Sequence, residues 1–191
     1  KEELNSYHVA DLADIFQELK PEERLQCFKL HDLDKAADLM EYLPPQMQVE
    51  LLGDIAENLA SQILTQLPHD AAADVLGDME DDESETYLDK LPHKFSEEVR
   101  ELLTYNEDTA GGIMNPSVLT VNSDMSVQDV LNHIRIKAEQ DNMELYYVYV
   151  TDKQNHLLGV VSLRKRLTSP TNQKVEDIMI SDIVKLHVDD Y

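Results

Sequence analysis

The sequence LMEYLP at residues 39–44 is one copy of a pattern that returns every 24 residues in the first half of the chain. It reappears as ILTQLP at residues 63–68 and as YLDKLP at residues 87–92, and residues 15–21 carry the related IFQELKP. The apolar residues of each copy fall at positions i, i+1 and i+4, which is the spacing of one helical face. A fixed period of this kind is typical of helical repeat proteins, whose units bury their apolar faces against their neighbours.

A helical corner is predicted at each leucine–proline pair. Proline follows each of four equivalent leucines within two positions, and these leucines are Leu19, Leu43, Leu67 and Leu91. Proline is well tolerated in the first turn of a helix, and an apolar residue lies eight positions beyond each leucine. We therefore predict an α-solenoid of short helical hairpins over residues 1–104. An irregular helical bundle is the alternative, because helices of about ten residues pack in either way.

The second half of the chain has the composition of a mixed α/β domain. Runs of β-branched and aromatic residues predict three strands, at residues 118–121, 146–150 and 157–161. Between the first two, Ser126 followed by Asp129 begins an amphipathic helix with a capping box. Residues 162–167 predict a closing helix, so the expected order is strand, helix, strand, strand, helix.

Several segments of this half together resemble a CBS (cystathionine-β-synthase) domain. They are IMNP at residues 113–116, the helix from Ser126, YYVYV at residues 146–150 and GVVS at residues 159–162. Residues 175–179 (VEDIM) and 183–188 look like the start of a second copy that is cut off. The expected division is a helical repeat domain at 1–104, a junction at 105–112, a CBS domain at 113–170 and an incomplete second CBS domain at 171–191.

The junction narrows the resemblance further. YNEDTAGGIM at residues 105–114 resembles the segment that joins the helical and CBS domains in the MgtE family of magnesium transporters. The resemblance extends over essentially the whole chain. It implies a transmembrane pore domain in the parent protein, placement at the cytoplasmic face of the membrane, a homodimer formed through the CBS domains, and conduction that is gated by Mg²⁺.

Composition excludes some classes of partner. The 191 residues carry 39 Asp and Glu against 16 Lys and Arg, a net charge of -23, which opposes binding to nucleic acids and anionic membranes. The longest apolar run, at residues 145–150, is far below the roughly 20 residues that span a bilayer. We therefore expect a soluble chain. The sequence offers no nucleophile elbow or phosphate-binding glycine loop, so we expect no enzymatic activity.

The acidic residues are concentrated in the helical half. Residues 36–89 contain 14 carboxylates and no Lys or Arg, so neighbours along the chain cannot neutralise them. Asp70, Asp74 and Asp78 are spaced i, i+4, i+8, and Asp82 and Glu85 extend the series if the helix persists. Like charges at this spacing each cost roughly 0.2–0.5 kcal/mol. The pattern therefore suggests a bound cation.

Magnesium is the cation that we expect, since it binds through one or two carboxylates while keeping several waters. The candidate ligands are Glu50, Asp54, Asp74, Asp78, Asp81, Asp82, Glu83 and Glu85. The choice of Mg²⁺ over Mn²⁺ or Ca²⁺ rests mainly on the family resemblance, because all three accept carboxylates. A solvated acidic face that aids solubility is the alternative. Under the resemblance, Mg²⁺ would bridge acidic faces and close the pore of the parent protein.

A nucleotide-responsive CBS module is the second functional hypothesis. In nucleotide-binding CBS domains a Ser or Thr after the third strand is followed three residues later by an Asp that holds the ribose. Ser162 and Lys165 occupy these positions here. Lysine cannot accept a hydrogen bond from a ribose hydroxyl, although it could contact phosphate. A scaffold of the flagellar-switch kind is a third hypothesis, but it gives no reason for a CBS domain.

Overall fold

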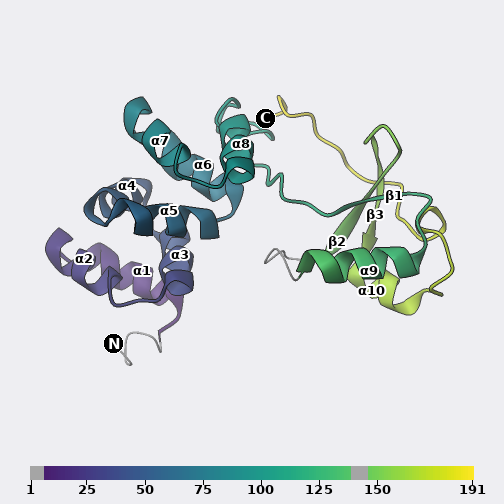
Figure 1. Ribbon diagram of the computed structural model, residues 1–191, viewed down its shortest axis with the longest axis horizontal. Helices are drawn as coiled ribbons and strands as arrows, with labels where there is room; N and C mark the ends of the chain where they lie inside the picture. Colours follow the sequence, from purple (N-terminus) through teal and green to yellow (C-terminus); the bar gives the residue numbers. More distant parts are fainter. Residues whose placement is uncertain (1–6, 139–145) are drawn as a thin grey trace. The chain divides into compact units, whose positions relative to one another are not determined.

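The computed structural model describes residues 7–138 and 146–191. These residues form two compact units, which we describe separately. The first comprises the described residues of Lys1–Pro116 together with His187–Tyr191, and the second comprises those of Ser117–Leu186. Figure 1 shows that the first unit is built of short helices, whereas the second combines a small sheet with helices.

Four helical hairpins make up the described part of the first unit. Their helices are α1 (Val9–Glu18), α2 (Pro21–Phe28), α3 (Leu33–Tyr42), α4 (Pro45–Asp54), α5 (Glu57–Gln66), α6 (His69–Gly77), α7 (Asp81–Leu88) and α8 (His93–Leu102). The predicted corners are confirmed, because each leucine–proline pair separates the two helices of one hairpin. Leu43, Leu67 and Leu91 are buried, and Pro21 and Pro45 begin α2 and α4.

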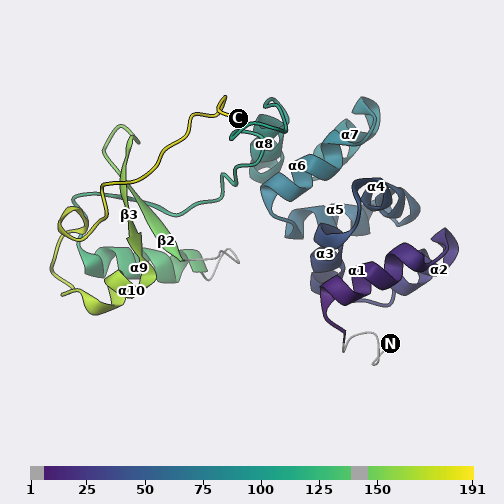
Figure 2. The ribbon, with the colours of Figure 1, turned by 180° about the vertical axis from the view of Figure 1, so that it is seen from behind.

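Packing of the hairpins buries one continuous apolar core. Helix α1 packs on α3, α3 packs on α5, and α6 packs on α8, and this stacking can be followed from both sides in Figure 1 and Figure 2. Phe16, Leu39, Met40, Ile63 and Leu64, from the first helix of three successive repeats, are all completely buried. In the second, third and fourth repeats the i, i+1 and i+4 residues therefore form the core, as the helical spacing predicted, whereas Ile15 of the first repeat is exposed.

A buried hydrogen bond recurs at the same place in three of the four hairpins. A side chain in the second helix donates to the main-chain carbonyl eight residues earlier, near the end of the first helix. The pairs are Arg24 Nε to Phe16 (3.1 Å), Gln48 Nε2 to Met40 (2.5 Å) and Ser96 Oγ to Leu88 (2.8 Å). Each of these carbonyls also accepts from the main-chain amide three residues later at 3.2 or 3.3 Å, so the side-chain bond is a second one that joins the two helices of the hairpin.

The second unit has a three-stranded sheet in the order β1-β2-β3. Strand β1 (Thr120–Asn122) is parallel to β2 (Tyr147–Thr151), which pairs antiparallel with β3 (Leu157–Ser162). Helices α9 (Val127–Ala138) and α10 (Leu163–Thr168) follow the first and third strands. The predicted order of elements is confirmed. The first strand is shorter than expected, since residues 118 and 119 precede it, although the Leu119 carbonyl still accepts from the amide of Tyr149 at 2.9 Å.

Local sequence explains two features of this unit. The predicted capping box is present, because the Ser126 amide donates to Asp129 Oδ2 and the Asp129 amide donates to Ser126 Oγ, each at 3.2 Å. Asn155, in the turn between β2 and β3, has φ 63°, a conformation that asparagine adopts more readily than most residues.

The predicted start of a second CBS copy forms little regular structure. A 3₁₀ turn, η2, covers Val175–Asp177, and Ile180 exchanges hydrogen bonds of 2.9 and 3.0 Å with Val160 of β3. Residues 183–188 form no strand in the described structure. Within the first unit, the carbonyl of Val188 instead accepts from the amide of Gly111 at 2.8 Å, and that of Asp190 accepts from Ala110 at 2.7 Å.

Candidate functional site

A row of carboxylates runs along α6. Asp70 and Asp74 lie in this helix and Asp78 caps its C-terminal end, as the i, i+4, i+8 spacing predicted. The pKa of Asp74 is raised, first because the protein partly shields the carboxyl from water and then because of the negative charges of Asp70, Asp78 and Glu107. None of these four carboxylates forms an ion pair within the described residues.

Helix α3 adds acidic side chains to the same region. The pKa of Glu41 is raised, chiefly by partial burial and then by the charges of Asp38 and Asp70. Asp70 Oδ1 is shielded from solvent and accepts no hydrogen bond from any described group. An oxygen in this situation is normally satisfied by a bound water or ion. The acids Asp38, Glu41, Asp70, Asp74, Asp78 and Glu107 are called the α3–α6 cluster below.

The sequence did not identify three members of the α3–α6 cluster as candidate ligands. Asp38 and Glu41 precede Asp70 by 32 and 29 residues, and Glu107 belongs to the junction segment. Helical spacing identifies only acids that share one helix. These three acids lie elsewhere in the sequence and act electrostatically with the α6 row because the hairpins pack together. The 24-residue period offers a partial signal, because it places α3 and α6 in successive hairpins.

The series expected from Asp78 through Asp82 to Glu85 is wrong, because the helix does not persist. Helix α6 ends at Gly77, and Glu80 is the N-cap of α7. Asp81, Asp82 and Glu83 instead occupy the first turn of α7. Acidic residues are favourable there, because the unpaired amides of a helix N-terminus carry partial positive charge. The acidity of this turn therefore has a structural cause that needs no cation.

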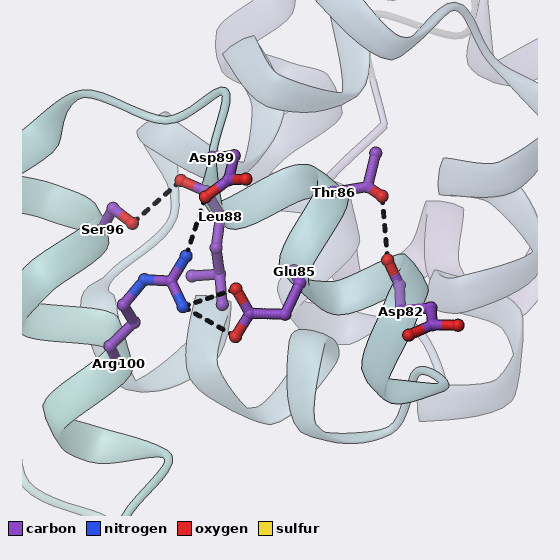
Figure 3. Close-up of polar contacts among 7 residues, drawn as sticks. All are labelled: Asp82, Glu85, Thr86, Leu88, Asp89, Ser96 and Arg100. Carbon is purple, nitrogen blue, oxygen red and sulfur yellow. Dashed lines mark hydrogen bonds and ion pairs between the residues drawn. The ribbon is translucent and has the colours of Figure 1, made fainter.

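Glu85, another predicted ligand, is neutralised by the protein. Figure 3 shows Arg100 of α8 reaching across to α7, where Nη1 lies 2.7 and 2.6 Å from the two carboxylate oxygens of Glu85 and Nη2 lies 3.1 Å from Asp89. Thr86 Oγ1 in the same view donates to the Asp82 carbonyl at 2.8 Å. Glu85 is consequently a contact between α7 and α8 rather than an uncompensated acid.

Cations of the protein compensate two more of the central acids. Arg24 Nη1 lies 3.3 Å from Glu50, a predicted ligand, and Lys90 Nζ lies 2.5 Å from Glu57. The cations come from other repeats, so distance along the sequence did not reveal them. Asp54, at the end of α4, forms no ion pair among the described residues.

The carboxylates do not converge on a single point. Across residues 7–138 and 146–191, no three His, Cys, Asp or Glu side chains are placed to hold one metal ion directly. The α3–α6 cluster is instead a concentration of negative charge. Such a surface suits a hydrated cation, which is held by one or two carboxylates and by hydrogen bonds from its own waters.

The predicted nucleotide-binding pair lies at the start of α10. Ser162 is the N-cap of this helix, and its Oγ accepts from the Lys165 amide at 3.3 Å. The side chain of Lys165 is exposed, whereas the neighbouring Arg166 is buried. Burial lowers the pKa of Arg166. Ser162 therefore has a structural role as a cap, and Lys165 supplies an exposed positive charge beside it.

The two units define the class of protein: a chain that joins a helical repeat domain to a CBS-type domain. The family model of the MgtE intracellular N domain matches residues 7–108, and that of the CBS domain matches residues 110–167. The chain therefore belongs to the MgtE family, as its junction suggested. None of the helices in the described part is both long and apolar enough to cross a membrane.

Known proteins similar to this chain include two bacterial transporters. The chain is 38% identical over 92 residues to the magnesium transporter MgtE of Thermus thermophilus and 33% identical over 93 residues to that of Enterococcus faecalis. These matches cover 48% and 49% of this chain and 20% of each relative. The aligned region thus spans about a fifth of the length of these relatives.

Two solved structures share the fold over almost the whole chain. The crystal structure of the cytosolic domain of the Mg²⁺ channel MgtE in complex with ATP matches with a TM-score of 0.91 and 32% identity, covering 99% of this chain and 77% of that one. The soluble part of a magnesium transporter matches with a TM-score of 0.82 and 25% identity, covering 99% and 74%. The predicted fold class, helical repeats followed by a CBS-type domain, is confirmed.

Proposed function

We propose that this chain is the Mg²⁺-sensing regulatory region of a magnesium transporter. The observation that carries the proposal is the environment of Asp74, whose charge is opposed by Asp70, Asp78 and Glu107. Like charges this close disfavour one another, and they persist in a folded protein when something else compensates them. A divalent cation is the compensating species that the chemistry of the cluster fits best.

Hydrated Mg²⁺ is the form of the ion that suits this surface. Magnesium gives up its waters reluctantly and is commonly held through one or two carboxylates. Asp70 Oδ1, which lacks a donor among the described groups, would accept a hydrogen bond from an ion-bound water. The predicted ligands on α7, Asp81, Asp82 and Glu83, remain part of the proposal as a second acidic surface on the same unit.

The regulatory mechanism that we propose is a shift between two conformations. Mg²⁺ bridging acidic faces would stabilise a closed state, and loss of the ion would allow like charges to separate those faces. An ion shifts such an equilibrium only through a difference in affinity between the states. A change from 1:99 to 99:1 requires a difference of about 10⁴-fold. In the parent protein the closed state would shut the pore.

The remaining parts of the proposal follow the family. The parent protein would contain a transmembrane pore domain, and this chain would lie at the cytoplasmic face of the membrane as a homodimer formed through its CBS domains. We retain residues 1–104, 105–112, 113–170 and 171–191 as the proposed helical domain, junction, CBS domain and partial second CBS domain. No catalytic activity is proposed.

Titration calorimetry with MgCl₂ tests the Mg²⁺ site. A triple variant, Asp70→Asn, Asp74→Asn and Asp78→Asn, is compared with a control that removes the same charge from α1, Asp11→Asn, Asp14→Asn and Glu18→Gln. We expect saturable binding that is lost in the first variant and retained in the second. Equal loss in both would show that only the net charge matters, and unchanged binding in the α6 variant would refute the site.

We also propose, as a second function, that the CBS domain binds a nucleotide. A structural relative of this chain with a TM-score of 0.91 was solved in complex with ATP. Lys165 is exposed next to the N-terminus of α10, where it would favour phosphate. Binding of a fluorescent ATP analogue should weaken in Lys165→Ala and persist in Lys153→Ala, an exposed lysine of the β2–β3 turn. Equal affinity in both variants would reject the role of Lys165.

A further inference from the structure

The four leucine–proline corners of the helical unit differ in one respect that bears on its motion. Counting in steps of 24 from Arg24, the residues at the equivalent position are Gln48, Ala72 and Ser96. The first, second and fourth hairpins each use this position to bind the carbonyl eight residues earlier. Ala72 is fully buried at the same position, but its methyl group has no hydrogen to donate.

The third corner therefore lacks the side-chain hydrogen bond that joins the two helices of the hairpin at the other three corners. We call this hydrogen bond the cross-link. Its carbonyl, that of Leu64, accepts from the Leu67 amide at 3.2 Å. The equivalent main-chain bonds are also present in the other hairpins, for example from Leu43 to Met40 at 3.2 Å. The side-chain bond is the part that is missing. A buried hydrogen bond of this kind contributes roughly 0.5–1.5 kcal/mol net.

Charge repulsion is concentrated at the same corner. Asp70 lies in the first turn of α6, directly after the corner, and its charge raises the pKa of both Glu41 on α3 and Asp74 on α6. The side chains of His69 and Lys94 face another acid, since His69 Nε2 lies 2.8 Å and Lys94 Nζ 3.6 Å from Glu98 of α8. Those two groups are engaged on the α8 side and leave the repulsion between α3 and α6 in place.

From these two observations we infer that the α5–α6 corner is the joint at which the helical unit opens. The hairpins on either side are held by Gln48 and Ser96, so opening separates α1–α5 from α6–α8. It breaks the hydrogen bond from Tyr87 Oη to the Leu52 carbonyl (3.1 Å) and is favoured by repulsion between the charges of Glu41 and Asp70. The inference that the joint is weak is independent of the proposed function. Its control by Mg²⁺ rests on that function, because the ion would neutralise the acids whose charges oppose each other across the joint.

Hydrogen exchange measured by NMR on the intact chain without Mg²⁺ tests the joint. Gln48, Ala72 and Ser96 offer equivalent probes, since their amides donate to Pro44, Pro68 and Pro92 at 3.1, 2.9 and 2.9 Å. We expect the Ala72 amide to have a protection factor about five-fold or more below the other two, which is the ratio that one hydrogen bond of about 1 kcal/mol supports. Equal or greater protection at Ala72 would overturn the inference.

Two matched variants test the cross-link: one adds it at the third corner, and the other removes it at the fourth. Ala72→Ser introduces the hydroxyl found at Ser96 and should raise protection at the third corner by about five-fold, whereas Ser96→Ala should lower protection at the fourth by a similar factor. A fall at the fourth corner in Ser96→Ala supports the cross-link even if Ala72→Ser does not fold. If Ser96→Ala leaves protection unchanged, the cross-link does not control the corner and the inference fails.

Adding MgCl₂ separates this inference from the proposed function. If both hold, the ion raises protection selectively at Ala72, and the Asp70→Asn variant removes this effect. If the Ala72 amide is weakly protected but its protection does not change with Mg²⁺, the inference of a weak joint is supported and Mg²⁺ control of this joint is refuted. A response spread evenly over all the corners would overturn the assignment of Mg²⁺ control to this joint.

Discussion

Arg100 Nη1 lies within 2.7 Å of both carboxylate oxygens of Glu85, although the two residues belong to different helices of the last hairpin. The contact raises the pKa of Arg100, first through the hydrogen bond with Glu85, and a second contact to Asp89 at 3.1 Å extends it. One exposed cation thus compensates two acids of the stretch 36–89, which itself contains no Lys or Arg. The acids of the α3–α6 cluster have no such ion pair among the described residues.

Removing this cation should have a small, salt-dependent effect on stability. We expect Arg100→Ala to lower the free energy of unfolding by roughly 0.5–1 kcal/mol at low salt, because exposed ion pairs contribute little and salt screens them further. Urea unfolding at low and high NaCl measures the effect. Lys94→Ala, which loses one ion pair of 3.6 Å, is the control and should change stability less. A loss that is equally large at high salt would contradict an electrostatic origin.

Neutralising Asp74 should stabilise the protein at neutral pH. Its pKa is raised in the folded state, so that state binds protons more readily than the unfolded chain, and stability falls as the pH rises through the unfolded and then the folded pKa. We expect Asp74→Asn to gain roughly 0.2–0.5 kcal/mol at pH 7 for each close like charge that it relieves. The gain should disappear below about pH 4, where the carboxyl is protonated in both states.

Asp152 gives a control of opposite sign for that pH dependence. Its pKa is lowered, chiefly by the hydrogen bond from the His156 amide and then by the His156 ring. Its contribution is therefore present above the unfolded pKa and is lost as the pH falls through the folded value. Asp152→Asn should destabilise the protein at pH 7 and have little effect in acid. Parallel pH profiles for the two variants would be inconsistent with the two environments.

The repeated buried hydrogen bond should be worth more than a surface contact. Gln48→Ala removes the side-chain bond to the Met40 carbonyl, which keeps its bond from the Leu43 amide, and we expect a loss of about 0.5–1.5 kcal/mol in the free energy of unfolding. Gln46→Ala, at an exposed position of the same helix, is the matched control and should stay within about 0.5 kcal/mol. Chemical denaturation of both variants compares them directly. Equal losses in the free energy of unfolding of the two variants would show that the buried hydrogen bond of Gln48 does not contribute to stability.

Gly159 should tolerate no side chain. A Cβ at this position would lie 2.4 Å from the carbonyl oxygen of Ile180, so Gly159→Ala must displace the segment that pairs with β3. Overpacking of this kind typically costs about 1–3 kcal/mol. Gly77→Ala, whose added Cβ would lie 3.4 Å from the flexible Leu103 side chain, should be far milder. Thermal unfolding distinguishes the two, and similar losses would argue against the close backbone contact.

The local features of this protein were predictable because they depend on neighbours in the sequence. The 24-residue period located the helices and their corners, and Ser126 with Asp129 located the start of α9. Arg24, Gln48 and Ser96 recur with the same period, yet their role was missed because a polar residue on a short helix ordinarily faces solvent. Burial of these side chains depends on how the two helices of a hairpin pack.

The sequence by itself determined the secondary structure, the order of the domains and the excess of negative charge. Only the tertiary structure decided which acids remain uncompensated. Arg100 and Arg24 reach Glu85 and Glu50 across 15 and 26 residues of sequence, and Glu41 meets Asp70 through the packing of separate hairpins. The physical reason is that helical periodicity is a short-range property of the chain, whereas electrostatic energy depends on distance in space.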